Sequence, residues 1–149
     1  MASLILTLAV ITTGLYAGFM LTFLLAVMPG LAALPDDRFT AAMRRFNEKV
    51  PGPVFLLLFL GVIAFPVVAL FTESGEDRWP QVVAASACAV ASHLVTIGGN
   101  IPLNKALAES EGGDDSAARA AFETRWNTLH RFRTVLSLAA FVLLAAAAH

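Results

Sequence analysis

Four long apolar stretches constrain this chain more than any other feature of its sequence. A helix of about 20 mainly apolar residues spans the hydrocarbon core of a bilayer. The chain is 58% hydrophobic and only 14% charged, whereas a soluble domain has about 25% charged residues. We therefore predict an all-α fold, a single-domain integral membrane four-helix bundle over residues 1–149, with helices at approximately 4–28, 53–71, 80–101 and 126–148.

The fourth stretch differs from the others because its apolar core, Val135 to Ala148, is too short to span a bilayer alone. The helix must therefore begin earlier, near Trp126. This start brings His130 and Arg133 into the inner interface of the membrane or into the bundle itself.

Lysine and arginine lie almost entirely in two of the three connections. Four of the ten lie between the first two stretches, and five lie between the apolar cores of the third and fourth. The remaining connection holds only Arg78, among three acidic residues. Because basic loops stay on the cytoplasmic side, we predict a multi-pass cell-membrane protein with both termini outside and the two basic connections cytoplasmic.

The first basic connection contains an amphipathic pattern. Asp36 and Asp37 are suited to the start of a helix. Apolar residues then recur at i, i+3, i+4 and i+7, which is one stripe of a helix. We expect this helix on the inner membrane surface or over the cytoplasmic mouth of the bundle. The stripe is Phe39, Ala42, Met43 and Phe46.

The composition also excludes several function classes. The formal net charge is −1, and no basic stripe is present, so nucleic acid is not an expected partner. Cys88 is the single cysteine, which excludes an intrachain disulfide and a cysteine-rich metal site. The expected partners are membrane lipid and a lipophilic small molecule, and oligomer formation is left open.

Polar residues interrupt the third and fourth stretches on one face of each helix. Spacings of three, four and seven place the members of each set together, and lipid cannot satisfy them, so both faces should point into the bundle. Tyr16 of the first stretch lies at a similar predicted depth. The two sets are Ser86, His93, Thr96 and Asn100, and Glu123, Asn127, His130, Thr134 and Ser137.

Three interpretations of these polar residues stay open. In the first, His93, His130 and Glu123 hold a metal, for which two imidazoles and a carboxylate suit iron, and imidazole also suits copper. In the second, His93, His130 and Tyr16 act as acid and base on a lipophilic phenol without a metal. In the third, the same groups form hydrogen bonds between helices, with a stabilisation of about 0.6 kcal/mol each.

Two blocks of sequence resemble a known family. The first is His93-Leu-Val-Thr96-Ile-Gly-Gly-Asn100-Ile-Pro102-Leu-Asn104-Lys-Ala-Leu107, and the second is Trp126-Asn127-Thr-Leu-His130-Arg-Phe-Arg133-Thr134. They are similar to the His, Asn-x-Pro-Leu-Asn-x-x-Leu and Trp-Asn-x-x-His-x-x-Arg-Thr blocks of the anthrone oxygenase-like membrane proteins, a four-helix family formerly of unknown function. One departure is Val50-Pro51-Gly52-Pro53, where an Asn-Pro-like helix start is expected.

The resemblance implies oxidation of an anthrone-like substrate with O₂. It adds five candidate substrate-binding residues to the histidines and Tyr16, namely Asn100, Asn104, Trp126, Asn127 and Arg133. Our first hypothesis is a membrane oxygenase-like protein that acts on a lipophilic phenolic substrate in a His/Asn-lined, cytoplasmic-side cavity. The cofactor is none, or a His-ligated iron or copper ion. The alternative is a non-catalytic carrier, lipid-binding protein or assembly partner.

Overall fold

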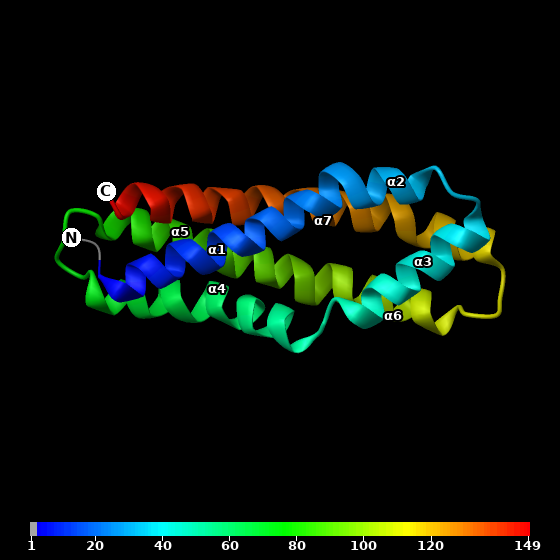
Figure 1. The fold of residues 1–149 in the computed structure, drawn as a ribbon, viewed down its shortest axis with the longest axis horizontal. Coiled ribbons are helices and arrows are strands. Elements are labelled where there is room, and N and C mark those ends of the chain that lie inside the picture. Colours follow the sequence, from blue (N-terminus) through cyan, green and yellow to red (C-terminus); the bar gives the residue numbers. More distant parts are fainter. Residues whose placement is uncertain (1–2) are drawn as a thin grey trace.

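The computed structural model describes residues 3–149, and the elements assigned there are helices (Figure 1). Four segments are long and apolar enough to cross a membrane, which confirms the predicted all-α four-helix membrane bundle. The elements are α1 (Leu4–Thr22), η1 (Phe23–Val27), α2 (Met28–Ala32), α3 (Asp36–Lys49), α4 (Pro53–Thr72), α5 (Trp79–Val95), η2 (Thr96–Asn100), α6 (Ile101–Glu109) and α7 (Asp115–Ala147).

Three of the four spanning helices are longer than their sequence pattern predicted. The first continues through Pro29 to Ala32, the third continues through Pro102 to Glu109, and the fourth begins at Asp115 rather than near residue 126. The early start of α7 has a local cause, because the Asp114 carboxylate accepts hydrogen bonds from the backbone N–H groups of Ser116 and Ala117. Such a cap satisfies the free N–H groups of a first helical turn.

Pro29 and Pro102 stay inside continuous helices because each follows a π-helical turn. The Met28 N–H bonds to the Phe23 carbonyl, and the Ile101 N–H bonds to the Thr96 carbonyl, each five residues back. Proline lacks an N–H, and its ring clashes with the carbonyl four residues earlier. A wider turn just before the proline accommodates both effects, and such turns are frequent at functional sites.

The matching π turns indicate that the two halves of the chain share a structural plan. In each half a long helix forms a five-residue π turn, and a proline follows two residues after it. The returning helices differ, because α3 and α4 are separated at residues 50–52, whereas α7 runs without a break.

The bundle is held by close packing and by hydrogen bonds within its interior. α7 packs on α5 and on α1, and α4 packs on α1 and α5. Ser92 of α5 donates to the Arg133 carbonyl of α7 at 3.0 Å, and its oxygen lies 2.9 Å from that of Ser137. A Cβ at Gly99 would lie 2.7 Å from the Leu129 side chain. Small residues thus allow α5, η2 and α7 to approach closely.

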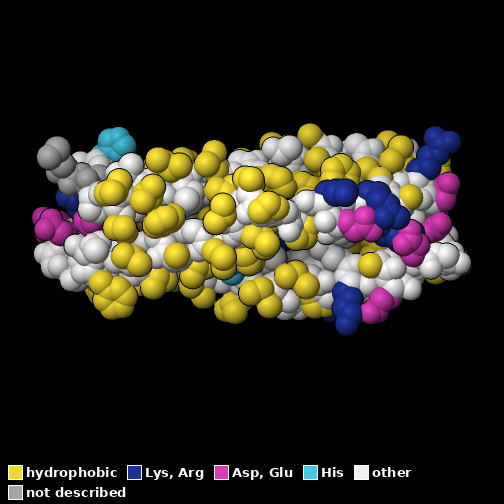
Figure 2. Space-filling view, turned by 60° about the horizontal axis from the view of Figure 1, so that its bottom comes forward, with side chains coloured by type: hydrophobic (Ala, Val, Ile, Leu, Met, Phe, Trp, Pro, Cys, Tyr) yellow, Lys and Arg dark blue, Asp and Glu magenta, His cyan; other side chains and the backbone are white. Residues whose placement is uncertain are grey.

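Both termini lie at one end of the bundle, and α3 and α6 lie at the other (Figure 1). Seven of the ten lysines and arginines lie in α3, in α6 or in the first third of α7, and we call this second end the basic end. Figure 2 shows apolar side chains covering most of the length of the molecule, with Lys and Arg gathered mainly toward one end. This band of apolar surface is what a lipid-facing bundle requires.

The predicted amphipathic helix forms α3 and covers the basic end. It packs against α2, α6 and α7. Phe39 and Met43 are fully buried in a cluster with Leu107, Phe122 and Trp126. The apolar stripe of α3 therefore lies against the bundle.

Two arginines, the buried Arg44 and the half-buried Arg119, connect α3 to its neighbours through hydrogen bonds. Arg44 donates to the Leu107 carbonyl at 2.9 Å, to Ser110 Oγ at 2.9 Å and to Asp115 Oδ1 at 3.2 Å. Arg119 of α7 donates to the carbonyls of Ala32 and Leu34 and to Asp36 Oδ1. These bonds satisfy carbonyls at the ends of α2 and α6 that have no partner within their own helices.

We predict that Arg44→Met lowers the free energy of unfolding by about 2 kcal/mol, because three hydrogen-bond acceptors lose a charged donor. Thermal unfolding in detergent should show a decrease in Tm of several degrees. Arg45→Met is the matched control, since Arg45 pairs with Glu48 and Glu111 on the exposed surface. Equal effects of the two substitutions would contradict the structural role assigned to Arg44.

Candidate functional site

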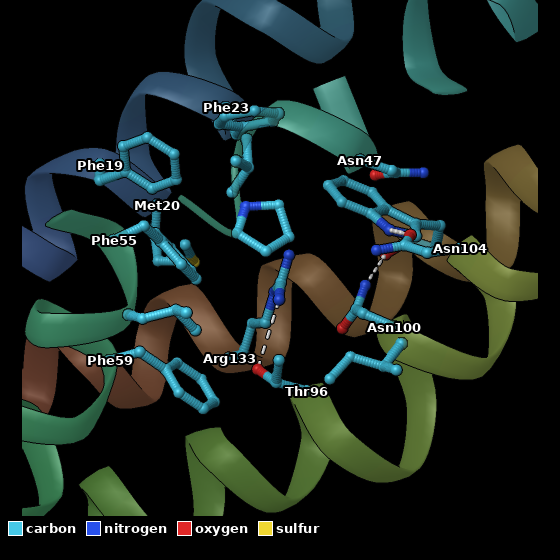
Figure 3. A pocket seen from close by; sticks show the side chains of 15 residues that line it. Phe19, Met20, Phe23, Asn47, Phe55, Phe59, Thr96, Asn100, Asn104 and Arg133 are labelled. Carbon is cyan, nitrogen blue, oxygen red and sulfur yellow. Dashed lines mark hydrogen bonds between the residues drawn. The ribbon is translucent and has the colours of Figure 1, made fainter. Parts of the chain in front are cut away.

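A cavity of about 150 Å³ lies between the helices near the basic end. It is bounded by α1 and η1, the end of α3, the start of α4, the η2–α6 junction and α7 (Figure 3). Its lining residues are Phe19, Met20, Phe23, Asn47, Val50, Pro51, Phe55, Leu56, Phe59, Thr96, Asn100, Ile101, Asn104, Trp126 and Arg133.

Four phenylalanines from α1, η1 and α4 form one wall of this cavity. Their ring centroids are 5.2 Å apart for Phe19 and Phe23, 5.4 Å for Phe19 and Phe55, and 5.9 Å for Phe55 and Phe59. Each helix contributes two rings at i and i+4, so they share a face. The wall suits a flat aromatic ligand, because aromatic rings associate at such separations.

Arg133 is the charged residue of the lining. It is 7% exposed, its Nε donates to His130 Nδ1 at 3.0 Å, and its Nη1 donates to Thr96 Oγ1 at 3.3 Å. Its guanidinium lies 5.2 Å from the Trp126 ring centroid. Among the described residues, no carboxylate forms an ion pair with it. All of these partners are neutral, so the cation lacks the counter-ion that buried charges normally have.

His130 holds this arginine in place. The ring is fully buried, and its Nδ1 must accept from Arg133, because a guanidinium can only donate. The proton of the neutral ring therefore lies on Nε2, which donates to the Met20 carbonyl at 3.0 Å. His130 also stacks on Trp126 with ring centroids 4.8 Å apart. This pair of bonds fixes α7 against α1 and orients the guanidinium.

Two asparagines and Trp126 form the polar wall opposite the phenylalanines. The Trp126 indole N–H donates to Asn104 Oδ1 at 2.8 Å. The Asn100 amide nitrogen donates to the Trp126 carbonyl at 3.2 Å, while Asn100 Oδ1 is buried without a hydrogen-bond partner. Asn47 Nδ2 is likewise buried and unpaired. The lining thus presents polar atoms that the protein itself leaves unsatisfied.

His93 and Tyr16 are not among the lining residues, and both pack against Phe59 of the phenylalanine wall. The His93 ring is 4.1 Å from Phe59 and 5.8 Å from Tyr16, measured between centroids. His93 Nε2 lies 2.7 Å from the Phe59 carbonyl, and Nδ1 lies 3.1 Å from the Ala89 carbonyl. The Tyr16 hydroxyl is buried without a hydrogen-bond partner.

The structure does not assemble the expected metal ligands. Within residues 3–149, no group of three or more His, Cys, Asp or Glu side chains is placed to hold a metal ion. Glu123 instead binds Arg119, with Oε2 2.7 Å from Nε. His130 uses both ring nitrogens for Arg133 and Met20. The set His93, His130 and Glu123 therefore does not fit a metal, and we derive no step through one.

The sequence located some of these residues and missed others. Asn100, Asn104, Trp126 and Arg133 line the cavity, whereas Asn127 lies outside its lining. Their roles in substrate binding stay predictions. The expected catalytic residues His93, His130 and Tyr16 are buried near the cavity but do not line it. The phenylalanine wall was missed, although its i, i+4 spacing in two apolar stretches was a usable signal.

The exposed lining residues at the starts of α4 and α6 indicate where the cavity opens to the molecular surface. Leu56 is 46% exposed and Ile101 is 49% exposed, and both also belong to the lining. Lys105 lies one helical turn beyond Ile101 toward the basic end. The opening is therefore close to the boundary between the apolar band and the charged end of the bundle.

We predict that Trp79→Phe yields a protein whose remaining tryptophan emission is blue-shifted and insensitive to aqueous acrylamide. The reason is burial, because Trp126 is 2% exposed whereas Trp79 is 41% exposed. Fluorescence of the Trp79→Phe protein in detergent provides the measurement. Strong quenching by acrylamide would show that the cavity wall around Trp126 is not formed.

The comparisons with known proteins give one family match. The family described as anthrone oxygenase matches residues 39–143. This range includes most of α3, continues from α4 to most of α7, and contains twelve of the fifteen cavity-lining residues. No curated protein and no solved structure gives a significant match. The matched range covers well over half of the chain, and the chain therefore belongs to the anthrone oxygenase family.

Proposed function

We propose that this protein binds a flat, lipophilic aromatic ketone or phenol of the anthrone type and promotes its oxidation by O₂. The observation that supports this proposal most directly is Arg133, a buried cation in an aromatic cavity with neutral partners only. Removing an ion from water costs several kcal/mol unless an opposite charge compensates. An anionic oxygen on the ligand would supply that charge.

The proposed reaction uses this cation to stabilise the enolate of the substrate. A C–H bond of the methylene carbon breaks, its electron pair moves into the ring system, and the proton passes to water. The negative charge gathers on the substrate oxygen next to Arg133, where a fixed donor is most effective. The electron-rich carbon then reacts with O₂ to form a hydroperoxide. Loss of water leaves a carbonyl, so the balance is CH₂ plus O₂ to C=O plus H₂O.

The histidines have positioning roles in this proposal. His130 accepts from Arg133 Nε and ties α7 to the Met20 carbonyl, so it aims the guanidinium without touching the substrate. His93 bridges α5 and α4 through the Phe59 carbonyl and supports the aromatic wall. Tyr16, stacked on His93, contributes to the same support.

The position of the cavity opening on the apolar surface supports a lipophilic ligand that enters from the lipid phase. The opening lies between α4 and α6, where Leu56 and Ile101 are half exposed. The positive-inside rule assigns the basic end to the cytoplasmic side. A substrate dissolved in the inner leaflet would then reach the cavity without crossing an aqueous phase.

We predict that Arg133→Met lowers kcat/KM for anthrone oxidation by about 100-fold, the usual loss when one stabilising donor for an oxyanion is removed. Oxygen uptake and anthraquinone absorbance provide the measurement, with the detergent-only rate subtracted. Arg131→Met is the control, because Arg131 is the exposed arginine two positions earlier.

Arg133→Lys separates charge from geometry, since lysine keeps the charge but lacks the planar fork of arginine. We expect intermediate activity, with Trp126 emission unchanged. Full activity of a folded Arg133→Met protein would contradict the proposed reaction.

We also predict that Ile101→Phe slows ligand association several-fold, because a larger ring narrows the opening. Stopped-flow quenching of Trp126 in the Trp79→Phe protein provides the measurement, since this substitution adds no new tryptophan. Ile97→Phe is the matched control, since Ile97 is 55% exposed one turn away and lies outside the lining. Equal association rates in both variants would exclude this entry route.

A non-catalytic carrier of the same ligands is the second candidate. The observation that favours it is the use of His93 and His130 in bonds between helices, which leaves the lining without a histidine or carboxylate to act as a base. Turnover distinguishes the two candidates. A carrier would bind anthraquinones in the Trp126 assay and give no anthrone oxidation above the detergent-only rate.

A further inference from the structure

We infer that Asn100 selects ligands that present a hydroxyl group in addition to the oxygen bound by Arg133. This inference rests on the proposed function, and it assigns a specificity role to one atom of the cavity, Asn100 Oδ1. Asn100 is fully buried, its Oδ1 has no hydrogen-bond partner, and the residue belongs to the cavity lining.

The orientation of the Asn100 amide follows from its surroundings. Its Nδ2 lies 3.2 Å from the Trp126 carbonyl, and a carbonyl can only accept a hydrogen bond. The amide nitrogen must therefore point to Trp126, which leaves the oxygen for the cavity. Turning the amide would place two acceptors against each other, so the protein cannot satisfy Oδ1 in this way.

The π turn explains why this oxygen points into the cavity. Asn100 is the last residue of η2, and Thr96 is the first. A π turn inserts one extra residue into the helical repeat, which rotates the following side chains. In Figure 3 the oxygen end of Asn100 is directed to the side of Arg133 and Thr96. The cation and the unpaired acceptor thus face the same space.

These two groups impose different requirements on a ligand. Arg133 donates and is positively charged, so it favours an acceptor oxygen with a partial or full negative charge, such as a ketone or enolate oxygen. Asn100 Oδ1 accepts, so it requires a donor, and a hydroxyl is the donor that an aromatic ketone or phenol normally offers. A ligand with a methyl ether in place of the hydroxyl leaves a buried acceptor unsatisfied, which is a large penalty in such sites.

The other polar groups of the lining do not duplicate this role. Asn104 Oδ1 already accepts from the Trp126 indole, and the Thr96 hydroxyl donates to the Ser92 carbonyl at 3.0 Å while accepting from Arg133. Asn47 has an unpaired nitrogen, which is a donor. Among the groups described in the lining, Asn100 Oδ1 is the buried side-chain acceptor without a partner.

The test compares the binding of 1- and 2-hydroxyanthraquinone with that of their own methyl ethers. These compounds are already oxidised, so binding is measured without turnover. The measurement is quenching of Trp126 in the full-length Trp79→Phe protein in detergent. We expect at least one hydroxyl compound to bind about tenfold or more tightly than its ether. Asn100→Leu should reduce that ratio to within about twofold, chiefly by weakening the hydroxyl compound.

Asn127→Leu is the matched control, because it makes the same side-chain change one residue after Trp126 and outside the lining. It should keep the wild-type preference. Asn100→Ala is the second variant if Asn100→Leu does not give the blue-shifted Trp126 emission of a folded cavity, and the same loss of preference is expected.

The remaining outcomes contradict either the role of Asn100 or the proposed function. If the wild-type protein binds hydroxyl and ether compounds equally, or if the Asn100 variants keep the preference, the role of Asn100 is wrong while the proposed aromatic ligand site stands. If neither kind of anthraquinone quenches Trp126, the proposed function fails together with the inference.

Discussion

The interior of this bundle contains a positive charge that no carboxylate in residues 3–149 neutralises. Arg133 is buried in α7, and its partners are a neutral imidazole, a hydroxyl and an indole ring. Such a charge is expensive in a membrane-embedded bundle. His130 lowers the cost by accepting from Nε, and it can do so only as a neutral ring whose remaining proton binds Met20. The proposed chemistry starts from this arrangement, because an anionic ligand oxygen would supply the missing opposite charge.

Two prolines shape the space that this charge faces. Pro29 and Pro102 each follow a π turn, and residues of both π turns line the cavity, Phe23 from η1 and Thr96 and Asn100 from η2. A regular helix at either place would direct different side chains inward. The break between α3 and α4 at residues 50–52 also contributes to the cavity, because Val50 and Pro51 belong to its lining. The cavity therefore lies where regular helical structure is interrupted or widened.

Much of the fold could be predicted from the sequence, whereas less of the site could be. Apolar length identified the four spanning helices, and periodicity identified α3, because both patterns reflect burial directly. Helix ends were missed, since Pro102 resembles a stop signal unless a π turn is foreseen. For the site, the polar stripe of the third stretch included Asn100, whereas Asn104, Trp126 and Arg133 were named through the family resemblance. All four line the cavity, and their part in substrate binding stays a prediction. The histidines were assigned chemistry, but their ring nitrogens are used by backbone carbonyls and Arg133, and such contacts between helices have no sequence signature.

The most direct measurement of the central claim is the absorption spectrum of anthrone bound to the protein in the absence of O₂. At a pH where free anthrone is the neutral ketone, binding next to Arg133 should produce the visible absorption of the enolate, because the cation stabilises the charged form. The folded Arg133→Met protein should bind anthrone without this band. A wild-type complex that shows only the neutral ketone would contradict the claim that Arg133 stabilises an anion in this cavity.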